Sequence, residues 1–270
     1  MQLQQAAERF KSQGIGLAAI SYDTEAILKD FAERQHIAFP LLADPQSEII
    51  SKYQVLNAEA QGMTKGMPHP GFFYIDSTSK VKEKFFETAY TERYTANNLI
   101  SKLFPELGEQ VPRTINAPHI SLKLQQSDQT AFPGSRLTLM VDLDLPPGLH
   151  VYAPGAKGYI AIEANLDSAP ELKLDATIYP QPKTLFLPAI KETAPVFGGK
   201  FRIAQDITIS ADRSFSSSLG QGKTISIKGQ LKYQACDEKI CYAPVSTPLN
   251  WDVQVVPLDR QRSPAAIQHR

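Results

Sequence analysis

The hydrophobic pattern of the first 105 residues alternates between helical spacing and short apolar runs. Apolar residues three and four positions apart predict helices over residues 3–10, 24–32, 47–53 and 91–103. Short apolar runs predict strands over residues 15–22, 39–44, 71–76 and 81–86. The run at 15–22 is nearly continuous, which is typical of a strand buried on both faces in a parallel sheet. This order of elements predicts an α/β fold.

The second part of the chain has almost no helical period and instead alternates apolar with polar residues. The alternation predicts strands over residues 119–124, 136–145, 159–166, 172–179, 201–209, 224–233 and 251–256. Each strand has one apolar face, as expected of an antiparallel sheet that packs on one side. Short strands in this number, separated by turn residues, predict an all-β, immunoglobulin-like sandwich.

Prolines mark the boundary between the two parts. The stretch from Pro105 to Pro118 holds three of the twenty prolines and little periodicity, which indicates an interdomain linker. We therefore expect a first domain over residues 1–106, a linker over 107–117, a second domain over 118–257 and a tail over 258–270. The tail is polar and without a pattern, so we expect it to be frayed.

Charge and hydropathy exclude several classes of protein. The chain has 28 basic and 28 acidic residues, so it has no overall positive charge with which to bind nucleic acid. No apolar run reaches the roughly 18 residues of a membrane-spanning helix, so no membrane span is predicted. The residues after Met1 form neither a basic nor an apolar region, so no signal peptide is predicted in this sequence.

The candidate chemistry lies in the only two cysteines of the chain. Cys236 and Cys241 are separated by four residues and flank a predicted turn, so they can approach closely enough for a disulfide. Closing so short a loop stabilises a fold by only about 2 kcal/mol. This small gain favours a redox pair over a structural bridge, and both interpretations stay open. The five histidines are scattered, so a metal site is not predicted. A redox pair that works by dithiol–disulfide exchange needs no organic cofactor, so none is predicted.

The residues around the cysteines carry recognisable motifs. The segment YQACDEKICYAP (233–244) resembles the active-site hairpin of the N-terminal domain of DsbD, the thiol:disulfide interchange protein, and GLHVY (148–152) resembles its G-W-x-x-Y segment. Residues 178–180 and 195–201 resemble later elements of that domain, the second being the cap loop over the cysteines. The resemblance covers about residues 118–256. DsbD spaces its cysteines by five residues, so the turn here is one residue shorter.

The resemblance implies an immunoglobulin-like domain that passes electrons to partner proteins by dithiol–disulfide exchange, with Cys236 and Cys241 as the catalytic pair. It implies thioredoxin-fold or other disulfide-bearing partners, and a periplasmic or extracytoplasmic location, because disulfides persist in oxidising compartments. It also implies a set of residues in the cap or around the active site: His150, Tyr152, Val196, Phe197, Tyr233 and Tyr242. Aromatic residues such as Tyr152, Phe197, Tyr233 and Tyr242 more often serve in core or rim packing than as shields of an active site.

The order of attack by the two thiols is not fixed by local charge. Asp237 and Glu238 should raise the pKa of the Cys236 thiol by repulsion, and Lys239 should oppose them. We prefer Cys241 as the thiol that forms the mixed disulfide, with Cys236 resolving it. Access is expected to come from residues 195–201 lifting away as a loop, because Gly198 and Gly199 suit a mobile segment.

Four segments of the first part also carry motifs, at residues 18–23, 39–45, 49–55 and 69–76. They resemble the redoxin (AhpC/TSA, peroxiredoxin-like) branch of the thioredoxin fold, in which Pro70 matches the cis-proline position. The pattern lacks the first strand of that fold, and residues 1–235 contain no cysteine. Either Met1 is an internal methionine of a longer gene, which we favour, or this half is a non-catalytic partner.

The sequence therefore predicts a thioredoxin-like α/β domain, lacking its first strand and catalytic cysteines, followed by a β-sandwich that acts as a thiol–disulfide oxidoreductase. The alternative is a non-catalytic interaction module, in which the sandwich holds a structural disulfide beside a degenerate redoxin domain.

Overall fold

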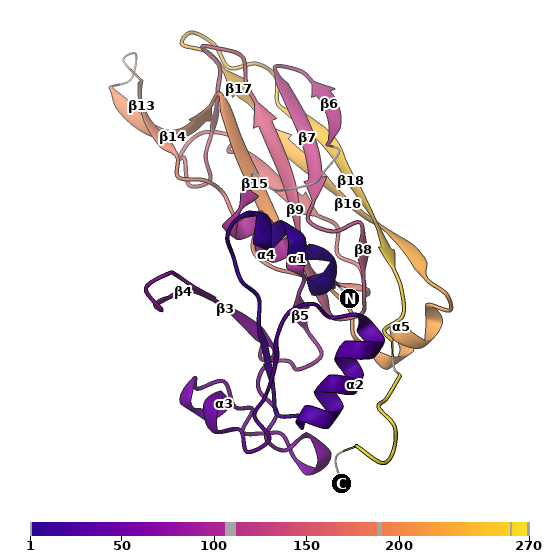
Figure 1. Ribbon diagram of the computed structural model, residues 1–270. Coiled ribbons are helices and arrows are strands. Elements are labelled where there is room, and N and C mark those ends of the chain that lie inside the picture. The colour runs from indigo at the N-terminus through magenta and orange to yellow at the C-terminus, as the bar shows by residue number, and fades with distance from the viewer. Residues whose placement is uncertain (1, 106–111, 188–190, 260, 269–270) are drawn as a thin grey trace. The chain divides into compact units, whose positions relative to one another are not determined.

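The structure is a computed structural model that describes residues 2–105, 112–187, 191–259 and 261–268 (Figure 1). The chain divides into two compact units. The first contains Met1–Leu107 together with Leu258–Arg270, and the second contains Gly108–Pro257. The first unit mixes helices with strands, and the second is rich in strands.

The first unit has its main elements in the order that the sequence predicts. Its helices are α1 (Gln2–Ser12), α2 (Glu25–Gln35), α3 (Glu48–Lys52), the short 3-10 turn η1 (Gly62–Thr64) and α4 (Ala96–Leu103). Its strands are β1 (Ala19–Ser21), β2 (Leu41–Ala43), β3 (Gly71–Ile75), β4 (Val81–Phe86) and β5 (Arg93–Tyr94). β1 pairs with β2 in parallel, and β3 pairs with β4 antiparallel.

Helices α1 and α4 form the small core of the first unit. Ala6 and Phe10 of α1 pack against Ala96 and Ile100 of α4. The start of α4 is fixed by Thr95, whose side chain accepts a hydrogen bond from the backbone N–H of Asn98. The helix predicted over residues 91–103 therefore begins later than expected, at Ala96, because Thr95 caps it and Arg93–Tyr94 forms β5.

The strand expected over residues 15–22 is shorter and more exposed than the prediction. Only Ala19–Ser21 forms a strand, and the side chain of Ile20 is 38% exposed. Its partner β2 likewise exposes Leu42. The expectation of a strand buried on both faces is therefore wrong, because two paired strands of three residues offer too little area for helices to cover both faces.

Pro70 is not a cis-proline. No peptide bond among the described residues is cis, so the bond before Pro70 is trans. The trans form is favoured by about 0.5–1 kcal/mol unless the surroundings select the other isomer. Here the carbonyl of Pro70 accepts a hydrogen bond from the backbone N–H of Glu87, which extends the β3–β4 pairing.

The second unit contains two large sheets. One has the strand order β12-β15-β9-β7-β6 and the other β11-β16-β18-β8. The strands of the first sheet are β6 (Arg113–Ala117), β7 (Ile120–Gln126), β9 (Ser135–Asp144), β12 (Leu172–Leu174) and β15 (Lys200–Ile209). Those of the second are β8 (Thr130–Ala131), β11 (Glu163–Leu166), β16 (Lys223–Tyr233) and β18 (Val245–Val255). A short helix, α5 (Arg213–Ser218), connects β15 to β16.

One hydrophobic core is shared by the two sheets. Leu122 of β7 and Ile203 of β15 belong to the same buried cluster as Leu231 of β16 and Trp251 of β18. β16 alternates buried and exposed residues along most of its length, as the period-two pattern of its sequence predicts. The apolar faces of the two sheets therefore enclose a common interior.

A third, smaller sheet lies in the same unit and was not predicted. Its order is β13-β14-β10-β17, with β13 (Lys183–Leu187), β14 (Glu192–Gly198), β10 (His150–Tyr152) and β17 (Ala235–Cys236). All three residues of β10 are buried, so the strand shows no alternation of apolar and polar positions. This sheet carries Cys236.

The boundaries between the parts differ in detail from the expected ones. Residues 107–111 of the expected linker lie outside the described residues, whereas Arg113–Ala117 forms β6 and pairs with β7. Ile115 and Ala117 alternate with polar residues and pack against the core, which explains the strand. In the tail, Gln35 of α2 donates a hydrogen bond to Asp259, while residues 260, 269 and 270 lie outside the described residues.

No helix in the described parts of the chain has the length and apolar character needed to cross a membrane.

The second unit should be stable without the first. We expect a fragment of residues 108–257 to unfold in one cooperative transition in urea, because its shared core is formed within these residues. In this fragment Leu231→Ala should lower the free energy of unfolding by about 2–5 kcal/mol, since the side chain is fully buried. The control Lys232→Ala, at an exposed position of the same strand, should change it by less than about 0.5 kcal/mol. A non-cooperative transition, or equal effects of the two substitutions, would contradict this expectation.

Candidate functional site

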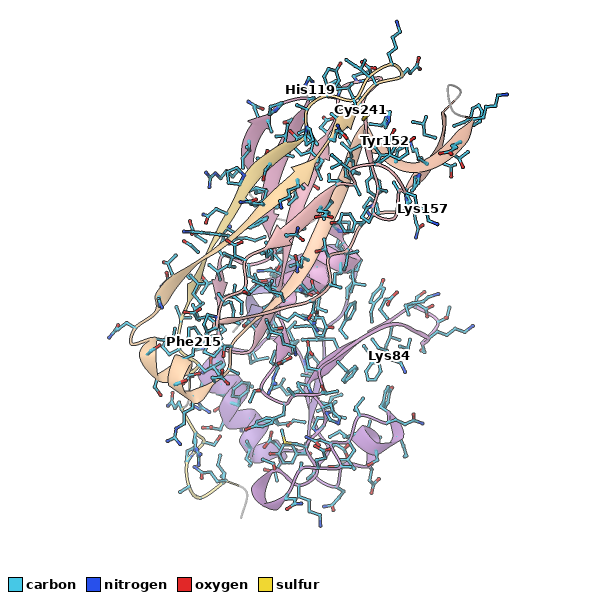
Figure 2. All side chains as sticks on the ribbon, turned by 180° about the vertical axis from the view of Figure 1, so that it is seen from behind. Lys84, His119, Tyr152, Lys157, Phe215 and Cys241 are labelled. Carbon is cyan, nitrogen blue, oxygen red and sulfur yellow. A yellow bond between two sulfur atoms is a disulfide. The ribbon has the colours of Figure 1, made fainter. Side chains whose placement is uncertain are left out.

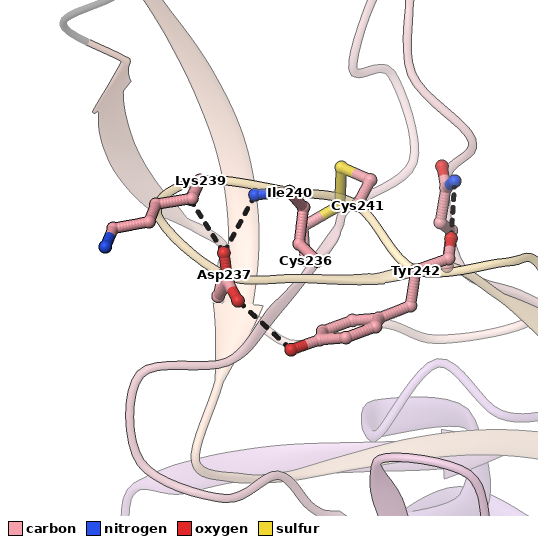
Figure 3. The surroundings of a disulfide bond; sticks show 7 residues. Cys236, Asp237, Lys239, Ile240, Cys241 and Tyr242 are labelled. Carbon is pink, nitrogen blue, oxygen red and sulfur yellow. Dashed lines mark hydrogen bonds between the residues drawn. A yellow bond between two sulfur atoms is a disulfide. The ribbon is translucent and has the colours of Figure 1, made fainter.

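The two cysteines form a disulfide at one end of the second unit. Cys236 closes β17, and the chain returns after a tight turn to Cys241, whose Cα lies 4.0 Å from that of Cys236 (Figure 3). The two residues also face each other as an isolated antiparallel bridge. Beyond the turn, Val245–Val255 continues as β18 and pairs with β16 along its whole length. The site is therefore the tip of a long hairpin.

The two sulfur-bearing residues differ strongly in exposure. Cys236 is 1% exposed and packs with Tyr152, Ala194 and Val196 in a small cluster of its own. Cys241 is exposed, and Figure 2 shows it at the same end of the unit as Tyr152. Of the two cysteine residues, Cys241 is therefore the one open to solvent, while Cys236 is shielded.

Asp237 organises the turn between the cysteines. Its Oδ1 accepts hydrogen bonds from the backbone N–H groups of Lys239 (2.7 Å) and Ile240 (2.8 Å). Its Oδ2 accepts one from the hydroxyl of Tyr242 at 3.0 Å (Figure 3). An aspartate that caps backbone groups two and three residues later is a common way to fix a tight turn. Asp237 therefore connects the start of the turn to its later residues, through Lys239, Ile240 and Tyr242.

These contacts set the charge state of the turn. The backbone N–H of Ile240, followed by that of Lys239, lowers the pKa of the Asp237 carboxyl group. The hydrogen bond to this carboxylate raises the pKa of the Tyr242 hydroxyl. The turn thus carries a stable negative charge beside the disulfide.

Strand β10 supplies the wall behind Cys236. His150 pairs directly with Cys236 across the β10–β17 ladder, and Tyr152 follows two residues later on the same face. The His150 ring lies edge-on to Tyr152, with centroids 5.3 Å apart, and Tyr159 stacks on Tyr152 at 3.9 Å. Burial lowers the pKa of the His150 imidazole, and the charge of Asp237 opposes that shift.

The expected cap loop is a strand in this structure. Residues Glu192–Gly198 form β14, which is hydrogen-bonded to β13 on one side and to β10 on the other. The backbone turns at Gly199, where φ is +65°, and then enters β15. The expectation of a loop over 195–201 is therefore wrong, because residues 195–198 belong to β14, which pairs with β13 and β10, and residues 200–201 begin β15, which pairs with β9. The aromatic ring that covers Tyr152 comes instead from Tyr159.

The structure gathers part of the expected site and separates the rest. His150, Tyr152, Val196 and Tyr242 lie around the Cys236–Cys241 disulfide. Two other expected members, Phe197 and Tyr233, point into the shared core. Phe197 stacks on Phe201 there, and the Tyr233 hydroxyl donates to the carbonyl of Pro118. Pro70 belongs to the first unit.

Some residues of the site were not identified from the sequence. Tyr159 lay within a predicted strand, and nothing in its spacing indicated that it stacks on Tyr152. Ala194 packs in the cluster of Cys236 without any chemical signature of its own. The turn-forming role of Asp237 had a usable signal, because aspartate at the start of a short polar segment favours such a turn.

Comparison with known proteins agrees with both resemblances. Residues 1–84 match the model of the AhpC/TSA family, and residues 121–250 match that of the thiol:disulfide interchange protein DsbD, N-terminal. The chain therefore joins an α/β redoxin region to a β-rich DsbD N-terminal region that holds both cysteines. No curated protein matches the chain.

Two solved structures are similar at low identity. One is the N-terminal periplasmic domain of ScsB from Proteus mirabilis, at 16% identity and a TM-score of 0.33, over 52% of this chain and 49% of that one. The chain thus spans about half the length of that relative. The other is the reduced N-terminal domain of DsbD from Neisseria meningitidis, at 17% identity and a TM-score of 0.31, over 59% of this chain and 98% of that one.

The turn predicts a measurable pKa. The carboxyl group of Asp237 should titrate below the ordinary aspartate value of about 3.9 in an NMR titration of the oxidised protein. Tyr242→Phe removes one donor and should raise this pKa toward the ordinary value, without reaching it, because both backbone donors remain. The control Tyr90→Phe, at an exposed tyrosine of the first unit, should leave it unchanged.

The sign of the effect on stability follows from the lowered pKa. The ionised Asp237 carboxylate stabilises the folded protein. This stabilisation is fully present above the pKa that the group has in the unfolded chain, and it is lost as the pH falls through the lower pKa of the folded protein. The wild-type protein should therefore lose more stability on acidification through this range than Asp237→Asn. An ordinary pKa for Asp237 would contradict the assignment of the turn.

Proposed function

We propose that the second unit exchanges electrons with partner proteins by dithiol–disulfide exchange at Cys236 and Cys241. One observation carries the proposal: in a region that matches the DsbD N-terminal model, a disulfide joins an exposed cysteine residue, Cys241, to a buried one, Cys236. A disulfide that serves only to hold a hairpin needs no such asymmetry. The ladder of β16 with β18 already holds this hairpin together.

The exchange proceeds through a mixed disulfide. A thiolate of a reduced partner attacks the Sγ of Cys241, the exposed residue of the pair, the bond between Cys241 and Cys236 breaks, and Cys236 takes the electron pair as a thiolate. A second thiolate of the partner then attacks its own bridged sulfur and releases Cys241. The partner leaves with a disulfide, and this protein keeps two thiols. The cycle uses no metal and no organic cofactor.

The partners follow from the same chemistry. A donor must carry two thiols in reach of each other and an acceptor must carry a disulfide, as thioredoxin-fold proteins and other disulfide-bearing proteins do in their reduced and oxidised forms. Ile240, next to Cys241, exposes 56% of its surface and offers an apolar contact beside the reacting sulfur. The first unit contributes no thiol, since residues 1–235 contain no cysteine.

The fold and location are part of the proposal. We assign the two large sheets, whose strands pair antiparallel except for β8 beside β18, and their shared core to an immunoglobulin-like sandwich, and the first unit to a thioredoxin-like fold. An exchanging disulfide works in an oxidising compartment, and the ScsB relative is a periplasmic domain. We therefore place this protein in the periplasm or another extracytoplasmic space.

The redox potential of the pair tests the function. In glutathione buffers of stepped composition, the fraction of Cys236–Cys241 disulfide, counted by thiol alkylation and mass spectrometry, should change over an accessible range above about −300 mV. Structural disulfides in extracellular proteins lie below that value. A disulfide that survives millimolar reduced glutathione would support the structural alternative instead.

Single cysteine variants test the order of attack. The probe is a thioredoxin-fold protein whose one remaining active-site cysteine carries a thionitrobenzoate leaving group. Cys236→Ser keeps the exposed thiol and should form a covalent complex with it, seen on a non-reducing gel. Cys241→Ser should form at least tenfold less complex, because Cys236 is 1% exposed. The double variant is the control, and equal trapping by both single variants would exclude Cys241 as the preferred entry point.

A further inference from the structure

His150 is a buried titratable residue with an unsatisfied polar atom. The residue is only 8% exposed, and its Nε2 is buried without a hydrogen-bond partner. Buried polar groups are paired in the great majority of cases, because an unpaired group has lost its bonds to water without replacement. The unpaired Nε2 lies beside the disulfide. We therefore ask whether His150 has a role in the exchange cycle that the oxidised form of the protein does not show.

The strand register places His150 next to Cys236. The two residues are direct partners in the antiparallel β10–β17 pair, so their side chains leave the same face with Cβ atoms about 4.5–5.5 Å apart. Tyr152, on that face, packs with Cys236 and touches the His150 ring. On the other side of His150 the paired residue is Gly198, which has no side chain to fill the space.

Cys236 needs a local proton acceptor in the exchange cycle. When a partner is bound to Cys241 as a mixed disulfide, Cys236 must attack as a thiolate to release it. A thiol that is 1% exposed resists ionisation, because burial raises thiol pKa values, and solvent hydroxide reaches it poorly. A proton acceptor next to Cys236 within the protein meets this need.

We propose that His150 accepts the proton of Cys236 as Cys236 resolves the mixed disulfide, an inference that rests on the proposed function. The Cys236 S–H bond breaks and its proton moves to the imidazole. A bond forms between the sulfurs of Cys236 and Cys241, the bond from Cys241 to the partner breaks, and the partner sulfur leaves with the electron pair. In the opposite direction the imidazolium returns its proton to the Cys236 thiolate.

The electrostatic surroundings suit this role. Burial, the larger effect, lowers the pKa of His150, so the imidazole is neutral near neutral pH and free to accept a proton. The charge of Asp237, in the turn after β17, favours the imidazolium once it forms. The strand partners of His150 are the titratable Cys236 on β17 and Gly198, which has no side chain, on β14, and the titratable Tyr152 contacts its ring from β10 itself.

Reaction of the reduced full-length chain with excess Ellman's reagent separates the two thiols. The exposed Cys241 reacts first, in a phase whose rate depends on reagent concentration. Cys236 then attacks Cys241 and releases a second thionitrobenzoate, in a phase independent of reagent concentration. At about pH 7, His150→Phe and His150→Gln should slow the second phase at least tenfold and leave the first unchanged within about twofold. Toward about pH 10, beyond the ordinary thiol pKa of about 8.5, the variants should approach the wild-type rate.

Controls and a second measurement complete the test. His36→Asn removes an exposed imidazole in the first unit, at a left-handed position that asparagine tolerates, and should leave both phases unchanged. In wild-type protein, the NMR titration midpoint of His150 should differ between the disulfide and dithiol states. This measurement needs no variant, so it tests the proposal even if a His150 variant fails to fold.

The outcomes are distinguishable. Three results would each overturn the role of His150 and leave the exchange function standing. The rate of the second phase in His150→Gln could equal that of the wild-type protein, or it could be reduced by the same factor at every pH. The third result is an NMR titration midpoint of His150 that is identical in the two redox states. Absence of the second phase in the wild-type protein would overturn the proposed function itself.

Discussion

The pairing of β10 on both of its edges is the constraint on which the site depends. This strand of three residues is hydrogen-bonded to β14 on one side and to β17 on the other. Its alternation sends Val151 into the shared core of the two large sheets, while His150 and Tyr152 face the disulfide. Val151 is fully buried, so the packing of the core fixes the position of both site residues. A large scaffold thereby positions a small reactive group.

Most strands of the two large sheets could be predicted from the sequence, because their residues alternate in polarity, whereas β6 and β8 were not predicted. β16 and β18 show this alternation clearly, and residues 224–233 were predicted nearly to their bounds. The third sheet could not be found in this way. β10 is buried at every position, and β14 contains Pro195, so neither shows the period-two pattern or the composition of an ordinary strand. In the first unit the order of elements was predictable, but strand burial was not, since it depends on neighbours that no local pattern specifies.

The composition of the site was predictable only in part, for a related physical reason. The cysteine pair follows from counting cysteines and from their spacing, but the aromatic residues around it depend on which face of a strand they occupy. Val196 and Phe197 are adjacent in β14, so only one of them can face Cys236, and the structure selects Val196. A shift of one residue in the strand moves each side chain to the opposite face of the sheet. A sequence motif does not tell which of two adjacent residues faces the disulfide.

The long ladder behind the disulfide has a consequence for the reduced protein. Tyr233 pairs with Val245 at the base of the turn, and the backbone N–H of Tyr242 donates to the carbonyl of Ala235, immediately beside Cys236. None of these bonds involves sulfur, so all of them can persist when the disulfide is opened. The two thiols then remain neighbours at a high effective concentration, much as linked binding modules do. Ring closure costs little additional chain entropy, and the hairpin returns to its oxidised form without searching for its partner sulfur.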